Sequence, residues 1–211
     1  TDIDWILAAL LSSFGFAIVS ITDKVIMTGM GLRVRGFLLF IGFQGLVVAL
    51  VITTLNPFPA SIEAAVYARG FAVGLMWGTG ASLMLWTLSR EEVSRVAPIF
   101  QSYTLLVVIF AVVLLGESLT GFESLAAVLA IGGAILAAAR LSAAGRIHFG
   151  SALAYLAVAM VVVALAQILL KTVTNDLSFW HASALRSAGM AVVLIPMNLR
   201  PVIARDLGRF M

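Results

Sequence analysis

The sequence predicts an all-α fold, a polytopic bundle of transmembrane helices. Of its 211 residues, 62% are hydrophobic and 11% are charged, whereas soluble domains are about 45–50% apolar and 25% charged. The apolar residues form long runs, and a helix needs about 20 of them to cross the hydrocarbon core of a bilayer. Because the runs lack the strict alternation of barrel strands, a β-barrel is disfavoured.

Seven apolar segments are predicted to be helices. They are residues 5–27, 36–55, 65–88, 96–115, 124–139, 149–170 and 177–199. Polar or turn-forming residues separate them, as in the run Asn56-Pro57-Phe58-Pro59 and the pair Gly116-Glu117. In the pair, the glycine is expected to end one helix and the glutamate to precede the next.

The arginines predict an orientation, because cytoplasmic connections are enriched in basic residues. Nine arginines flank the odd-numbered connections or the C-terminal tail, namely Arg33, Arg35, Arg90, Arg95, Arg140, Arg146, Arg200, Arg205 and Arg209. The opposite side has only Arg69 and Lys171. We therefore expect the odd connections in the cytoplasm and the N-terminus outside.

The two lysines, Lys24 and Lys171, indicate an internal repeat with an offset of 171 − 24 = 147 residues. Residues 1–147 would form a first five-helix unit, and residues 148–211 the first two helices of a second unit. An odd number of helices inserts the second unit upside down relative to the first. A complete second unit would need about 80 more residues and three more helices, so we expect the chain to be part of a longer protein.

The stretch from Ser89 to Gly133 has features of a known family. They are, in order, Val93-Ser94, Pro98 at the start of the fourth segment, Gly116-Glu117 at its end and Gly132-Gly133 in the fifth, with "ITDKVIM" around Lys24 ending the first. In these features the chain resembles the drug/metabolite transporter superfamily, specifically the EamA-type ten-helix transporters. It departs from the pattern at Tyr103 and Thr104, where a second proline is common, and the family's usual layout places both termini inside.

The resemblance implies a secondary transporter, a permease or exporter of the bacterial inner membrane that moves a small organic metabolite by alternating access. Its partners would be the lipid bilayer, the small-molecule substrate, and a proton or counter-substrate. The substrate cavity would lie between the two five-helix halves. The alternative is a non-transporting membrane scaffold or assembly subunit, whose small-residue stripes serve only helix packing.

Three basic residues are candidates for the substrate cavity, because charged groups inside a membrane are costly. Lys24 and Lys171 would hold an anionic group or titrate during coupling, unless they extend to the interface. Arg186 lies deeper, about nine residues into its segment. Its guanidinium would either face the cavity or bind backbone carbonyls or a carboxylate within the protein.

Four further residues are cavity candidates: Gln44, Trp77, Gln101 and Tyr103. Gln101 and Tyr103 belong to a run of four polar residues, of which at least one must face water or another helix. Gln44 would alternatively form an interhelical hydrogen bond. Trp77 is either packed in the core or forms an aromatic wall, which would suit planar or cationic substrates.

Other small residues predict helix packing. Gly74, Gly78 and Ser82 recur every four residues, which permits close approach of a neighbouring helix. Ala126, Ala130, Ala134 and Ala138 form a similar stripe, a packing surface or the interface of a homodimer.

Several function classes are disfavoured. The sequence has no cysteine and two histidines, so it offers no thiolate metal site. It has no zinc-protease motif, nucleophile elbow or P-loop, and its carboxylates are too few and peripheral to act as an acid–base pair. We therefore expect no enzyme activity, no metal and no cofactor. Nucleic acid is not expected as a partner, because the basic residues lie between membrane segments.

Overall fold

The computed structural model describes residues 34–59, 62–90, 96, 99–122, 124–129, 132 and 151–199, together with isolated residues between 7 and 25. The described part is all-α, as predicted. Its helices are α2 (Val34–Leu55), α3 (Ala64–Leu88), α5 (Tyr103–Leu115), α7 (Ser151–Asp176) and α8 (Phe179–Asn198). Most of the first predicted segment and most of the fifth lie outside the described residues.

The predicted helix limits hold for α2, α3 and α8 to within two residues and differ for the other two helices. Helix α7 continues to Asp176, six residues beyond the predicted end, and hydropathy missed this extension because most of its residues are polar. The fourth segment is not one regular helix, since the chain turns at Ser102 before α5 begins. The amide of Ser102 donates to Ile99 and that of Leu105 to Ser102, a tighter i to i+3 pattern.

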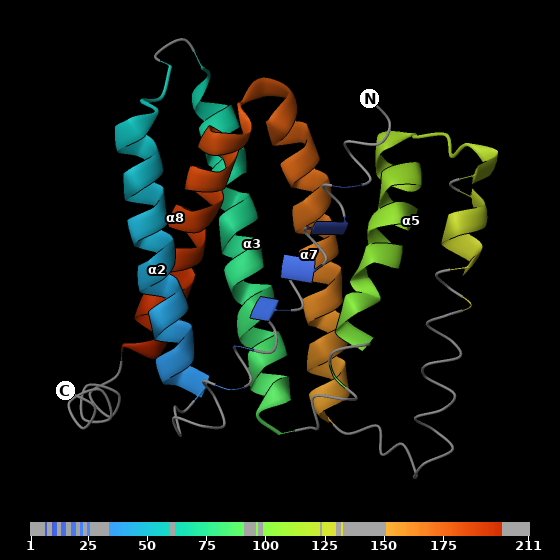
Figure 1. Cartoon of the computed structure of the whole chain (residues 1–211), viewed down its shortest axis with the longest axis horizontal. Helices are drawn as coiled ribbons and strands as arrows, with labels where there is room; N and C mark the ends of the chain where they lie inside the picture. Colours follow the sequence, from blue (N-terminus) through green and yellow to red (C-terminus); the bar gives the residue numbers. More distant parts are fainter. Residues whose placement is uncertain are drawn as a thin grey trace.

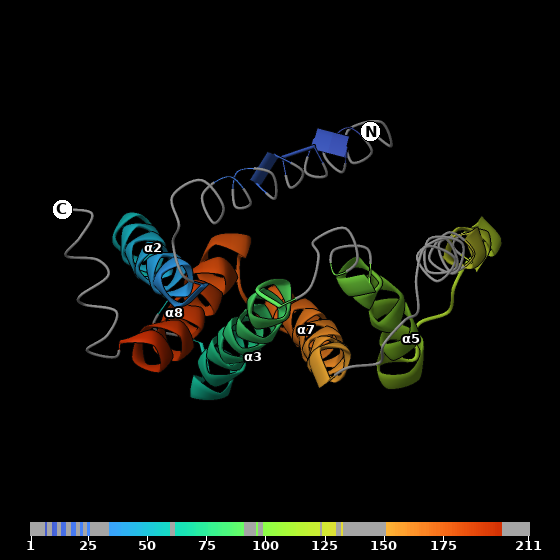
Figure 2. The same ribbon diagram turned by 90° about the horizontal axis from the view of Figure 1, so that it is seen from below.

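The five helices stand side by side in a row, in the order α2, α8, α3, α7, α5 (Figures 1 and 2). Helix α8 lies between α2 and α3, and α7 lies between α3 and α5. Helices α2 and α3 follow each other in sequence but have few contacts with each other. Helices from the end of the chain are therefore inserted between helices from its first half.

Glycines on α3 allow α8 to approach its backbone. A Cβ atom on Gly74 would lie 2.2 Å from the carbonyl oxygen of Arg186 and 2.7 Å from the Cα atom of Gly189. One on Gly189 would lie 2.3 Å from the carbonyl oxygen of Phe71. One turn further along α3, Gly78 faces Met190 and Val193. The small-residue stripe predicted on this helix is thus a packing surface.

In the described part of the chain, three clusters of buried side chains join the row. In one, Leu194 of α8 is fully buried against α2 and α3, among Phe37, Leu38 and Leu85. A second surrounds Val163 of α7 and includes Leu156, Ala159, Val96 and Phe100. The third joins α3, α7 and α8 and includes Val73, Ala166 and Ala182. On the far side of α2, large apolar side chains are exposed, including Phe40, Val47 and Leu50.

Three of the described helices are long and apolar enough to cross a membrane: α2, α3, and residues Ala154–Asp176 of α7. Helix α8 is 20 residues long but carries His181, Arg186 and Asn198. It is held between α2 and α3, so its polar residues lie beside protein and not only beside lipid.

Candidate functional site

Three of the sequence-predicted residues come together from three different helices. The guanidinium of Arg186 on α8 lies over the indole ring of Trp77 on α3, with 5.7 Å between its Cζ atom and the ring centroid. The ring of Tyr103, at the start of α5, meets the Trp77 ring edge to face, with centroids 6.5 Å apart and planes at 81°. We call Trp77, Tyr103 and Arg186 the aromatic–arginine cluster.

Two groups of the cluster lack the protein partner that they would usually have, as far as the described residues show. The Nε1 atom of Trp77 is buried and has no hydrogen-bond partner among those residues. Arg186 forms no ion pair with any carboxylate in the described part of the chain. Unpaired buried donors are unusual, because each costs about 1–3 kcal/mol. Within the described residues, the Nε1 donor of Trp77 therefore has no acceptor and the guanidinium of Arg186 has no carboxylate partner.

The local fold explains how these side chains meet. Gly74 precedes Trp77 by about one turn and lets the backbone of α8 approach at Arg186. Trp77 lies near the middle of α3, about 18 Å from either end at 1.5 Å per residue. Its ring contacts buried side chains of two separate clusters, which hold it between α7 and α8. The turn at Ser102 places Tyr103 beside it and beside Phe100.

A match over residues 3–139 shows the family to which the chain belongs. The model of the EamA-like transporter family matches residues 3–139, about two thirds of the sequence. The chain belongs to the EamA-like transporter family. No curated protein and no solved structure matches it significantly. The chain is thus an integral, multi-pass membrane protein of a family whose members transport small molecules. Membership in a transporter family agrees with the prediction that the chain is not an enzyme. Helices α2, α3 and α5 lie within the matched range.

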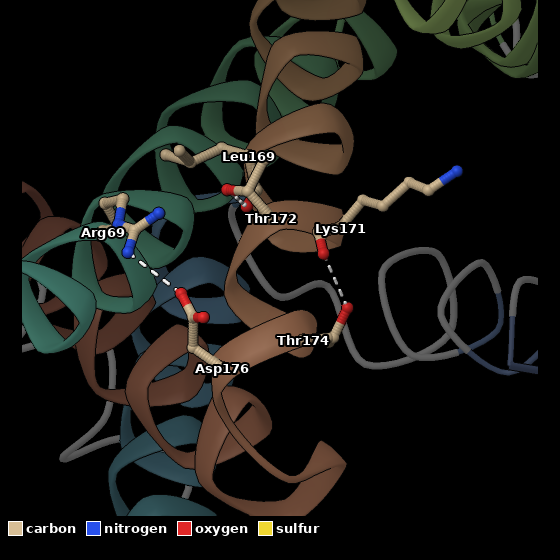
Figure 3. A network of polar contacts seen from close by, with 6 residues as sticks. All are labelled: Arg69, Leu169, Lys171, Thr172, Thr174 and Asp176. Atoms are coloured by element: carbon tan, nitrogen blue, oxygen red, sulfur yellow. Dashed lines mark hydrogen bonds and ion pairs between the residues drawn. The ribbon is translucent and has the colours of Figure 1, made fainter. Parts of the chain in front are cut away.

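Lys171 does not join the aromatic–arginine cluster of this EamA-like protein. Its side chain is exposed on α7 and forms an ion pair with Glu117, which follows α5. Figure 3 shows it pointing away from a second ion pair of α7, between Asp176 and Arg69 of α3, whose N–O distance is 3.0 Å. The two ion pairs connect the C-terminal end of α7 to α3 on one side and to the residue that follows α5 and Gly116 on the other.

Glu117→Gln should change the stability of the transporter only slightly. Both partners of the Glu117–Lys171 pair are partly exposed, and such pairs contribute about 0–1 kcal/mol. The expected result is a small decrease in the melting temperature of the detergent-solubilised protein at low salt, which disappears at about 1 M salt because of screening. Asp176→Asn serves as the matched variant for the other pair. A large decrease that persists at high salt would contradict this expectation.

The remaining candidates have a different environment. Gln44 on α2 and Gln101 just before α5 are both exposed. Neither side chain forms a hydrogen bond with another described residue. The interhelical hydrogen bond considered for Gln44 is therefore not seen. Lys24 lies outside the described residues. Within the described residues, no three His, Cys, Asp or Glu side chains group as metal ligands.

Two sets of contacts were not predicted from the sequence. The sequence predicts Gly116 and Glu117 only as a turn between helices. Gly116 does end α5, with a left-handed φ of 67°. Glu117 also forms an ion pair with Lys171, which the sequence did not predict. His181 hydrogen-bonds to Ser178 at 2.8 Å and to the carbonyl oxygen of Pro57 at 3.3 Å. The partners in the Glu117–Lys171 and His181–Pro57 contacts are 54 and 124 residues apart in sequence, and the only signal for the first was one acidic residue near a helix end opposite a basic residue.

Proposed function

We propose that this chain is part of a secondary transporter that moves a small organic metabolite by alternating access, with a substrate path beside the aromatic–arginine cluster. Export or uptake would be coupled to a proton or to a counter-substrate. The observation that carries the proposal is Arg186, a cation without a carboxylate partner in the described part of the chain.

The depth of Arg186 supports this proposal. It lies seven residues after the start of α8, or about 10 Å along the helix. Placing an arginine at the centre of a membrane helix costs at least about 2.5–3.5 kcal/mol unless water, a ligand or protein surrounds it. Trp77 meets the guanidinium with its ring and has no acceptor atom, and Tyr103 has a single phenol oxygen, so most hydrogen-bond donors of the guanidinium are suited to water or substrate.

We also propose the inverted repeat, with units at residues 1–147 and 148–211. Helices α2 and α8 occupy equivalent places in the two units, and Gly42 corresponds to Gly189 at the 147-residue offset. The two helices run antiparallel beside each other, as inverted units require (Figure 1). We further propose a bacterial inner-membrane location, which the family resemblance implies, and an N-terminus outside, which the arginine pattern favours.

A second candidate function, a membrane scaffold, is favoured by a different observation. A scaffold predicts that each charged side chain has a partner within the protein, and Lys171 does have Glu117. The α3–α8 glycine contact would also suit a protein whose role is only to pack. Arg186 separates the two candidates, because a scaffold gives it no reason to lack a carboxylate partner among the described residues.

Cysteine accessibility tests the choice between transporter and scaffold, because the sequence contains no native cysteine. In the full-length protein reconstituted in liposomes, we expect Tyr103→Cys to react with a small, membrane-impermeant thiol reagent. Two controls are expected to stay unreactive. Val73→Cys is fully buried, and Val47→Cys lies on the apolar outer surface of α2.

A path through the membrane gives a further expectation for the same variant. Reaction at residue 103 should be slowed when the reagent is applied from one side only, since alternating access opens the site to one face at a time. If Tyr103→Cys is as unreactive as Val73→Cys from both sides, the transporter proposal fails and the scaffold is favoured.

A further inference from the structure

We propose that the aromatic–arginine cluster recognises a small carboxylate whose body is flat and apolar, such as an aromatic acid. This inference rests on the proposed transport function and specifies its substrate class.

The hydrogen-bonding capacity of the cluster is mainly that of a donor. A guanidinium has five N–H donors and no acceptor, and an indole has one donor and no acceptor. The phenol of Tyr103 also offers a donor. A ligand that satisfies them must present oxygen acceptors, and a planar carboxylate matches the guanidinium fork with two parallel hydrogen bonds.

The charge of the cluster excludes cations. Arg186 has no carboxylate partner in the described residues, so a positively charged ligand would meet an uncompensated cation. In a medium of low dielectric constant, like charges a few ångströms apart repel strongly. Aromatic walls alone would suit cationic substrates, but an arginine over the ring reverses that preference.

The rings around the arginine favour a flat ligand body. The Trp77 ring centroid lies 5.7 Å from the Cζ atom of Arg186, and the Tyr103 ring meets the Trp77 ring at 81°, so an aromatic face lies next to the guanidinium and a second ring borders that face. A ligand ring beside them gains dispersion and offset or edge-to-face contacts. A short aliphatic carboxylate such as acetate would use the arginine but not these surfaces.

The test measures binding to the full-length protein purified in detergent. The probes are benzoate and indole-3-acetate, with benzamide, benzylamine and acetate as matched compounds that lack the carboxylate, the negative charge or the ring. We expect both aromatic acids to raise the melting temperature in a concentration-dependent way, because a ligand that binds the folded state stabilises it. The three matched compounds should have little or no effect.

Variants then locate the binding. Arg186→Gln should weaken benzoate binding about tenfold or more, since a charge-assisted pair is lost. Arg186→Lys, which keeps the charge but not the planar fork, should weaken it less, and Trp77→Phe, which removes only the indole donor, should also weaken it measurably. Arg69→Gln is the control, because Arg69 is paired with Asp176 outside the cluster.

The outcomes separate three readings. Stabilisation by benzamide or benzylamine equal to that by benzoate, or no response to either acid, would overturn the carboxylate assignment while leaving the cysteine test of transport unaffected. Stabilisation by phosphatidylglycerol micelles that requires Arg186, without any response to benzoate, would assign the arginine to a lipid headgroup and also overturn it. Equal loss of benzoate binding in Arg69→Gln and Arg186→Gln would place the binding elsewhere.

Discussion

Gly74→Ala is expected to destabilise the helix row by about 1–3 kcal/mol, the typical cost of inserting a methyl group into a packed core. The new Cβ atom would lie 2.2 Å from the carbonyl oxygen of Arg186 and 2.7 Å from the Cα atom of Gly189. Both atoms belong to the backbone of α8, so no side-chain rotation relieves the contact. The two helices must move apart, which also shifts Arg186 relative to Trp77.

The measurement is the melting temperature of the detergent-solubilised protein, obtained by heating samples and measuring by size-exclusion chromatography how much folded protein remains. Gly132→Ala is the matched control, because a Cβ atom there meets nothing within 4 Å. An alanine in a helix is favoured over glycine by about 1 kcal/mol, so this control should be neutral or slightly stabilising. Equal behaviour of the two variants would show that α3 and α8 are not in backbone contact.

Much of the fold could be predicted because each helix carries its own signal. The apolar runs that became α2 and α3 have the length of a membrane span, and Gly74, Gly78 and Ser82 recur at a spacing that only a packing face needs. The order of helices in the row could not be predicted in this way. Insertion of α8 between α2 and α3 depends on which faces fit each other, and hydropathy does not encode that.

The sequence singled out the residues of the cluster as cavity candidates but did not predict their contacts, and their role in a cavity stays a prediction. Trp77 and Arg186 each stood out as a polar or aromatic group inside an apolar segment. Their contact depends on the approach of α8 at Gly74, more than 100 residues away in sequence. Lys171 drew attention by the same reasoning and proved to be paired with Glu117, because a lone charge in a sequence gives no sign of its partner.

In the contact between α3 and α7 a glycine faces a side chain, whereas in the contact between α3 and α8 a glycine faces the backbone, and mutations can reveal this difference. A Cβ atom on Gly80 would lie 2.4 Å from the Cγ2 atom of Val163, a side-chain atom, and no backbone atom is closer than 3.5 Å. Gly80→Ala alone should therefore destabilise the protein by about 1–3 kcal/mol. Val163→Ala alone should also destabilise it, by about 2 kcal/mol, because Val163 is fully buried and its truncation leaves a cavity.

In the double variant Gly80→Ala/Val163→Ala, the added methyl group occupies the space that the valine vacates. We expect the combined loss to be smaller than the sum of the two single losses by about 1–3 kcal/mol, as for residues in direct contact. The same cycle with Gly74→Ala in place of Gly80→Ala should be additive, because Gly74 meets the backbone of α8 and not Val163. Additivity in both cycles would mean that Gly80 and Val163 do not touch, and that α7 does not pack against α3 at this position.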